Sequence, residues 1–230
     1  SLAAWLARPP SAAHAPVVIV LHGWGANAST LWPVVEPLTA AGLAVLLLDA
    51  ANHGDSSTED FSSLPRFAED LATARQALAG LEGVDATRVA LLGHSVGAAA
   101  VLLHAASDPQ VRAVVSLSAF AHPAEVMARW LREHRLPLRW PGRAILDEVQ
   151  QTIGARFDDI APLRSITRIA APVLLVHGEH DEVVPLTDML RLRARARHAE
   201  ALVVGGGHDL RETLPPHAPR LVAFLQVALR

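Results

Sequence analysis

Short apolar runs alternate with longer amphipathic segments along most of the chain. Each run has four to seven residues and little internal alternation, as expected of strands buried on both faces of a parallel sheet. The runs are residues 17–21, 44–48, 89–92, 111–117, 173–176 and 201–204, and helical patterns cover residues 30–41, 64–81, 96–106, 186–197 and 216–229. This alternation predicts an α/β fold with a doubly wound, mostly parallel sheet of about six or seven strands. Residues 2–7 are a candidate for one further strand.

One long segment, residues 120–168, interrupts the alternation. It contains no strand-like run, and helical patterns cover its residues 123–134 and 147–156. Because 49 residues are too many for an ordinary loop, we expect a small helical cap. The cap would be inserted into an α/β core made of residues 1–119 and 169–230.

The first predicted helix of the cap carries an apolar stripe. Met127, Trp130 and Leu131 lie at spacings i, i+3 and i+4 and therefore share one helix face. The stripe either covers an apolar substrate as a lid, with Met127 and Trp130 lining the pocket, or packs on the body of the domain. Both interpretations predict apolar surroundings for the substrate.

A sharp turn between a buried strand and a helix predicts the nucleophile. Gly93-His94-Ser95-Val96-Gly97 has the pattern G-x-S-x-G, with residues 89–92 before it and a helix of small residues after it. Such a turn holds the serine in a strained conformation and admits only small residues on either side. Ser95 also lies at a helix N-terminus, which favours developing negative charge.

A second glycine-rich turn, His22-Gly23-Trp24-Gly25, follows the run 17–21. Acyl transfer creates an oxyanion that needs two preorganised N–H donors. We expect the backbone N–H groups of Trp24 and Val96 to supply them. His22, Gly23 and His94 are predicted to line the substrate pocket.

Two later strand ends supply candidates for the base and the acid. A serine hydroxyl needs a base to take its proton and an acid to orient that base. Active sites of open α/β sheets lie at the carboxyl ends of the strands, where Asp181 and His208 occur. We predict Asp181 as the acid and His208 as the base, with Glu179 and then Asp209 as rival acids.

Other histidines receive different interpretations. His177 and His180 lie beside Asp181 and resemble metal ligands. No further cluster of histidines completes a site, so no metal is expected. His53 lies in the loop 49–56, which either is structural or contributes to the pocket.

Composition excludes several classes of function. Arginine and lysine total 20 against 23 acidic residues, a net charge of −3, so nucleic acid is not an expected partner. The absence of cysteine excludes a thiolate nucleophile and thiolate metal ligands. No apolar run is long enough for a membrane span, and residues 1–10 lack the features of a signal peptide. A cytoplasmic location is therefore expected, while the oligomeric state stays open.

These motifs, in this order, resemble the α/β-hydrolase superfamily. More narrowly, the chain resembles the bacterial serine aminopeptidase-like and dienelactone-hydrolase-like serine esterases over about residues 15–225. The matching segments are residues 22–25, 49–56, 93–97, 172–185 and 207–208. The chain departs from the dienelactone hydrolases proper, which use cysteine, and has room for at most one of the extra N-terminal strands that family members commonly carry.

The resulting hypothesis is a cofactor-free carboxylic ester hydrolase with a Ser-His-Asp triad, acting on a small-molecule ester or acyl substrate. A peptidase or thioesterase would use the same triad, because leaving-group binding separates these activities. The fold would also suit a catalytically inactive binding protein, and the same three residues would suit a cofactor-free lyase or perhydrolase.

Overall fold

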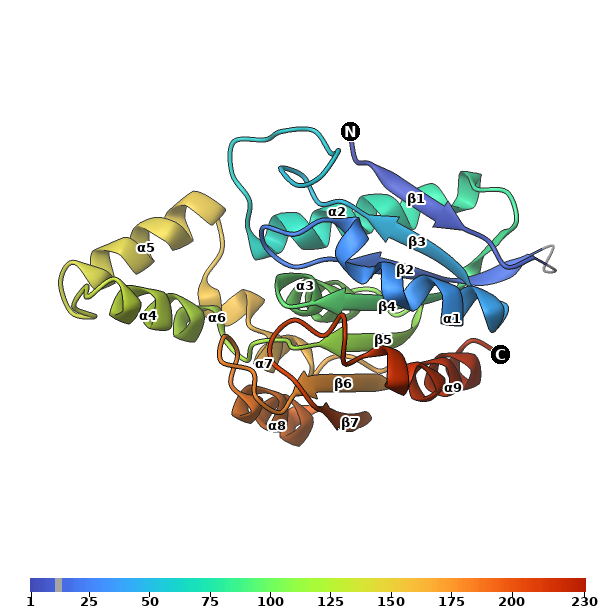
Figure 1. Ribbon diagram of the computed structural model, residues 1–230. Coiled ribbons are helices and arrows are strands. Elements are labelled where there is room, and N and C mark those ends of the chain that lie inside the picture. Colours follow the sequence, from blue (N-terminus) through green and yellow to red (C-terminus); the bar gives the residue numbers. More distant parts are fainter. Residues whose placement is uncertain (11–13) are drawn as a thin grey trace.

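A seven-stranded sheet with helices on both faces organises the molecule (Figure 1). The computed structural model describes residues 1–10 and 14–230. The strands are β1 (Ala4–Ala7), β2 (Ala15–Leu21), β3 (Ala44–Leu48), β4 (Val84–His94), β5 (Val111–Leu117), β6 (Val173–Gly178) and β7 (Ala199–Val204), in the order β1-β3-β2-β4-β5-β6-β7. The β1–β3 pair is antiparallel, and all other neighbouring strands are parallel. The predicted α/β class and mostly parallel sheet are confirmed, and the candidate N-terminal strand is the edge strand β1.

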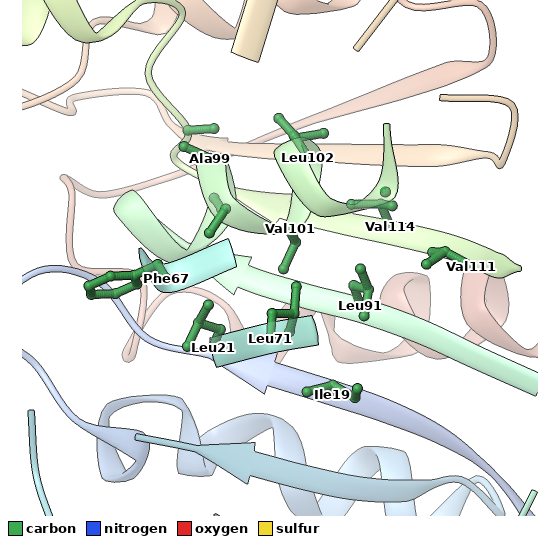
Figure 2. Close-up of a cluster of buried hydrophobic side chains, with 14 of the residues drawn as sticks. Ile19, Leu21, Phe67, Leu71, Leu91, Ala99, Val101, Leu102, Val111 and Val114 are labelled. Carbon is green, nitrogen blue, oxygen red and sulfur yellow. The ribbon is translucent and has the colours of Figure 1, made fainter. Parts of the chain in front are cut away.

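Alternate residues of the central strands enter two separate hydrophobic cores. Ile19 and Leu21 of β2 pack on one face of the sheet with α2 (Leu64–Ala77) and α3 (Val96–Ala105) (Figure 2). Val18 and Val20 pack on the other face with η1 (Ala28–Val34), α1 (Val35–Ala40) and α9 (Ala218–Ala228). Because both faces are covered, the central strands carry uninterrupted apolar runs that lack a period of two in the sequence.

Several helix boundaries differ from the predicted ones. The expected helix 30–41 is divided into η1 and α1, and Pro33, which has no N–H to donate, lies inside η1. The expected helix 64–81 ends as α2 at Ala77 and continues as the short 3-10 helix η2 (Leu78–Gly80). Helix α8 (Leu186–Arg195) is two residues shorter than the predicted 186–197. Before α9, residues 215–217 form the 3-10 turn η3 (Pro215–His217).

Residues 120–168, all of which the structure describes, contain four helices and no strand. They are α4 (Pro123–Glu133), α5 (Gly142–Ile153), α6 (Phe157–Ile160) and α7 (Pro162–Ser165). The second predicted helix, 147–156, begins five residues too late and ends three too late, since Gly154 adopts a left-handed conformation (φ +66°) that terminates α5.

The first two of these helices, α4 and α5, pack against each other and extend beyond the carboxyl edge of the sheet (Figure 1). By contrast, Phe157 and Ile160 of α6 belong to the core on the α2–α3 face. The division into a core and an inserted cap stays a prediction. Within the described residues, no helix combines the length and apolar composition that crossing a bilayer requires.

Candidate active site

The turn between β4 and α3 holds Ser95 in an unusual backbone conformation, with φ 55° and ψ −117°. Neighbouring chain approaches so closely that a side chain on either flanking glycine would collide with it. A Cβ on Gly93 would overlap the backbone of Gly97, and a Cβ on Gly97 would overlap the carbonyl oxygens of Leu21 and His22. The packed backbone therefore maintains a strained turn that places the Ser95 side chain at the carboxyl edge of the sheet.

A line of hydrogen bonds joins three of the predicted residues. The Oγ of Ser95 lies 2.9 Å from Nε2 of His208, and Nδ1 of His208 lies 2.8 Å from Oδ2 of Asp181. Ser95 and His208 are 113 residues apart in the sequence, and His208 and Asp181 are 27 apart. The carboxyl ends of β4, β6 and β7 bring them together.

Asp181 is buried and its carboxylate is surrounded by donors. Its Oδ1 accepts hydrogen bonds from the backbone N–H groups of Val183 (3.0 Å) and Val184 (2.8 Å), which leaves Oδ2 for His208. Burial opposes ionisation, but the hydrogen bonds from His208 and Val184 outweigh it and lower the pKa of Asp181 below its usual value. The group is therefore ionised at neutral pH.

The two rival acids are placed differently. Glu179 is exposed, and the carboxylate that His208 contacts belongs to Asp181 instead. Asp209 is also exposed and is paired with the guanidinium of Arg211.

His177, considered from the sequence only as a metal ligand, supports the acid. Its ring is fully buried, and its Nε2–H donates to the carbonyl oxygen of Val184 (2.8 Å) while lying 3.4 Å from Oδ2 of Asp181. Its neighbour His180 is exposed. No group of three or more potential metal ligands occurs within residues 1–10 and 14–230. The sequence signal that could have indicated this supporting role is the position of His177 at the end of an otherwise apolar strand.

The glycine-rich turn after β2 passes directly beside the nucleophile. A Cβ added to Gly23 would lie 3.0 Å from Cβ of Ser95. The N–H of Ala26 donates to the carbonyl oxygen of Gly23 (3.3 Å) and Gly25 has φ +68°, as in a type II turn. Among the described residues, no acceptor engages the backbone N–H of Trp24 or of Val96.

His22 lies behind this turn and is fully buried. Its Nδ1–H donates to the carbonyl oxygen of Gly23 (2.7 Å), and its Nε2 accepts from the N–H of Ala50 (3.1 Å). Burial is the main reason that its pKa is lowered, so the ring is neutral. Because a trans peptide points its C=O and N–H in opposite directions, His22 directs the N–H of Trp24 away from itself.

An apolar pocket of about 210 Å³ lies against two of the site histidines. His94 and His208 form part of its wall, η1 and Leu117 form another part, and residues 209–211 and Leu214 complete it. The Nε2–H of His94 donates to the carbonyl oxygen of His208 (2.8 Å). Burial lowers the pKa of His94 to about 4, so its ring is neutral and supports the His208 loop.

The cap residues predicted to line the pocket lie elsewhere. Trp130 is 44% exposed and stacks on His134 of the same segment, with ring centroids 4.2 Å apart. Met127 is partly buried and packs against the α2–α3 core. Neither contributes to the pocket beside His208.

Comparison with known proteins identifies the family. The serine aminopeptidase (S33) family matches residues 12–156, more than half of the chain. The chain belongs to this family. It is thus a member of a serine hydrolase family within the α/β-hydrolase superfamily, with esterases and lipases among its relatives and structural neighbours.

Two relatives are similar over most of this S33-family chain. An uncharacterized protein of Mycobacterium tuberculosis is 32% identical over 215 residues, covering 93% of this chain and 70% of the relative. The pimeloyl-[acyl-carrier protein] methyl ester esterase of Xanthomonas campestris is 28% identical over 236 residues, covering 85% of this chain and 88% of the esterase.

Solved structures share the fold. The Pyrococcus furiosus esterase Pf2001 superimposes with a TM-score of 0.77 at 20% identity, covering 100% of this chain and 86% of the esterase. Est1E of Butyrivibrio proteoclasticus, solved with ferulic acid bound, gives a TM-score of 0.75 at 20% identity, covering 99% and 95%. At such identities the likeness shows the α/β-hydrolase fold alone.

Proposed function

We propose that this chain hydrolyses carboxylic esters through an acyl-enzyme on Ser95. The observation that carries the proposal is the hydrogen-bonded line from Ser95 through His208 to Asp181, with both contacts under 3 Å. The esterase relatives and the family membership support the same class of reaction.

In the first step, Nε2 of His208 takes the proton of Ser95 as Oγ attacks the ester carbonyl carbon. The imidazolium that forms is stabilised by Asp181, whose lowered pKa keeps it ionised. The hydrogen bond from Nδ1 to Asp181 also selects the tautomer in which Nε2 is free to accept the proton.

The carbonyl oxygen becomes an oxyanion during this attack. The N–H groups of Trp24 and Val96 are the proposed donors. Val96 follows Ser95 in the chain, Trp24 follows Gly23, which lies beside Ser95, and neither N–H is engaged by another described residue. In a site shielded from water, each such donor contributes roughly 3–4 kcal/mol to transition-state stabilisation.

Collapse of the tetrahedral intermediate breaks the bond to the alcohol, which leaves with the proton from His208. Water then loses a proton to His208 as it attacks the acyl-enzyme carbonyl carbon. When the second tetrahedral intermediate collapses, the bond to Oγ breaks, His208 returns that proton to Oγ of Ser95, and the carboxylic acid is released. The atoms balance without a cofactor.

The nature of the substrate follows from the walls around the triad. The pocket beside His94 and His208 is mainly apolar, which favours an ester with an apolar group. Met127 and Trp130 remain proposed contacts for the part of the substrate that extends towards α4.

The test is intact-mass analysis after treatment with a fluorophosphonate, on the wild type and on Ser95→Ala. We expect one adduct on the wild type and none on the variant, with turnover of a p-nitrophenyl ester reduced by roughly 10³- to 10⁶-fold. Absence of an adduct on the folded wild type would favour a non-catalytic binding protein instead.

Matched substrates separate ester hydrolysis from its rivals. An ester, a thioester and an amide with one common acyl group should be compared by kcat/KM. We expect the ester to be cleaved fastest. A faster thioester or amide would instead indicate a thioesterase or a peptidase that uses the same three residues.

A further inference from the structure

The loop that follows β3 contacts the oxyanion turn through one side chain. We propose that His53 is a positioning residue, which fixes the backbone of Gly25 and thereby holds the N–H of Trp24 in place for the oxyanion. This inference rests on the proposed function and adds a positioning residue to the set formed by Ser95, His208 and Asp181.

Both ring nitrogens of His53 are engaged by the backbone. The Nδ1–H donates to the carbonyl oxygen of Ala51 (2.9 Å), and Nε2 accepts the N–H of Gly25 (3.1 Å). Only the neutral tautomer with its proton on Nδ1 makes both bonds. His53 thus connects its own loop to the turn that carries the proposed oxyanion donor.

The hydrogen bond to His53 constrains Gly25 from outside its own turn. A Cβ built on this residue would meet no atom within 4 Å, so no neighbouring group packs against that side of the residue. Its φ of +68° is required by the turn, but a glycine reaches many other conformations at little cost. Without His53, the N–H of the peptide between Trp24 and Gly25 loses its acceptor, and the peptide is held less firmly, because the turn then relies on the hydrogen bond from the N–H of Ala26 to the carbonyl oxygen of Gly23.

His22 and His53 hold neighbouring peptides of the same turn. His22 binds the carbonyl oxygen of the Gly23–Trp24 peptide, and His53 binds the N–H of the Trp24–Gly25 peptide. Because peptides are planar, these two contacts fix the backbone on both sides of the Trp24 α-carbon.

The ring of His53 is itself held on a rigid surface. It packs edge-on against Phe67, a fully buried residue of α2, with ring centroids 5.1 Å apart (Figure 2 shows Phe67 in the core). The indole of Trp24 stacks on the same phenyl ring at 6.3 Å with an angle of 10°, and it contacts His53 at 5.9 Å. Phe67 therefore supports both the positioning residue and the turn.

The loop that carries His53 is anchored as well. The buried carboxylate of Asp49 accepts the N–H groups of Ala28 (2.6 Å) and Asp55 (2.8 Å), one on each oxygen. A Cβ on Gly54 would collide with this carboxylate. The backbone around His53 is thus folded tightly about Asp49, which makes the side chain a fixed acceptor.

Two amide substitutions separate the two hydrogen bonds of His53. In His53→Gln, the side-chain oxygen reaches the position of Nε2 and can still accept from Gly25. In His53→Asn, the shorter amide reaches only the position of Nδ1, so it can donate to Ala51 but cannot reach Gly25. The same His→Asn change at His198, an exposed residue preceding β7 at the opposite edge of the sheet, is the matched control.

We expect His53→Asn to lower kcat by about 10- to 100-fold with KM changed by less than about twofold, because a misplaced oxyanion donor weakens only the transition state. His53→Gln should recover most of kcat, and His198→Asn should match the wild type. Affinity for a trifluoromethyl ketone, which forms an oxyanion adduct with the serine, should fall in parallel with kcat.

Titrating Ser95 with the fluorophosphonate counts the intact active sites in each preparation, so that every kcat can be expressed per intact site. A purely structural role would lower the melting temperature and the titrated fraction of the Asn and Gln variants alike, while kcat per titrated site stayed constant, and that result would overturn the inference. A wild type that takes no adduct would reject the proposed function instead, so the two failures are distinguishable.

Discussion

The body of the domain and the helices α4 and α5 differ sharply in how their residues are held. All residues of β3 and β6 are buried, and the polar side chains at the carboxyl edge of the sheet, such as Asp181, are hydrogen-bonded by backbone. In α4 only Pro123 and Leu131 are buried, and in α5 only Gly142 is.

Under the proposed function, this difference places the reacting groups in the rigidly held body and leaves α4 and α5 as a less tightly held surface beside it. The reacting groups need positions fixed to a fraction of an ångström, which densely packed strand ends supply. The surface beyond them exposes large apolar side chains, namely Trp130 of α4 and, in the segment between α4 and α5, Leu138 and Trp140. Such a surface can change with little effect on the triad, so related chains can share the reaction and differ in substrate.

The largest expected effect concerns the body. Replacing Asp181 by Asn leaves acceptors for Val183 and Val184 but presents an NH₂ group to His208, which selects the wrong imidazole tautomer. We expect kcat for a p-nitrophenyl ester to fall by about 10³- to 10⁴-fold. The melting temperature should stay within a few degrees of the wild-type value. Glu179→Gln is the control and should retain wild-type activity. An equal loss in the control would place the acid at Glu179.

An intermediate effect concerns the two helices. Leu131 is fully buried yet lies outside both large core clusters, close to Gly142 of α5. Leu131→Ala should lower the free energy of opening α4 and α5 by about 2–5 kcal/mol, measured by amide hydrogen exchange. The adjacent Trp130→Ala, at an exposed position, should change it by less than about 1 kcal/mol. If amides of β4 lost protection equally in Leu131→Ala, the helices and the body would be one cooperative unit and the predicted inserted cap would be wrong.

The smallest effect is a pH dependence within the body. Burial lowers the pKa of His94 from the usual 6.5 to about 4, so below pH 6.5 the unfolded chain binds a proton that the folded chain does not. Stability is therefore lost as the pH falls from 6.5 to about 4, by about 2–3 kcal/mol from this residue. His94→Gln, whose amide can still donate to the carbonyl of His208, should remove that loss in denaturant titrations at about pH 7 and about pH 4.5.

If the difference in stability between these two pH values is the same in His94→Gln as in the wild type, His94 is not the titrating group. The lowered pKa of Asp181 also contributes to stability, but this contribution is lost only as the pH falls below about 4, where carboxyl groups are protonated in the unfolded chain. It therefore does not interfere with the comparison between about pH 7 and about pH 4.5.

Local signals made most of the fold predictable. The apolar runs correspond to β2 through β7 because burial on both faces leaves an uninterrupted apolar segment that can be read directly. Boundaries were less predictable. Strand β4 spans Val84–His94, and its amino-terminal half is partly exposed and contains polar residues. The apolar pattern therefore predicted only the second half of this strand.

The candidate site divides in the same way. Ser95, Asp181 and His208 were recognisable because each follows a strand or begins a helix, and the carboxyl ends of parallel strands meet at one edge. The contribution of His53 was not recognisable, and His177 could be singled out only by its position at an apolar strand end. Each acts through a backbone atom of another turn, and nothing in the local pattern states which turn that is.

By itself, therefore, the sequence determined the class of fold, the order of the motifs and the residue types that can perform nucleophilic catalysis. These features depend on periodicity and on steric needs within a few residues, such as the glycines around Ser95. Only the tertiary structure decided which acid reaches His208, which histidines support the site and where the apolar pocket lies. Those depend on contacts between segments as many as 113 residues apart, whose distances arise from the packing of the whole sheet.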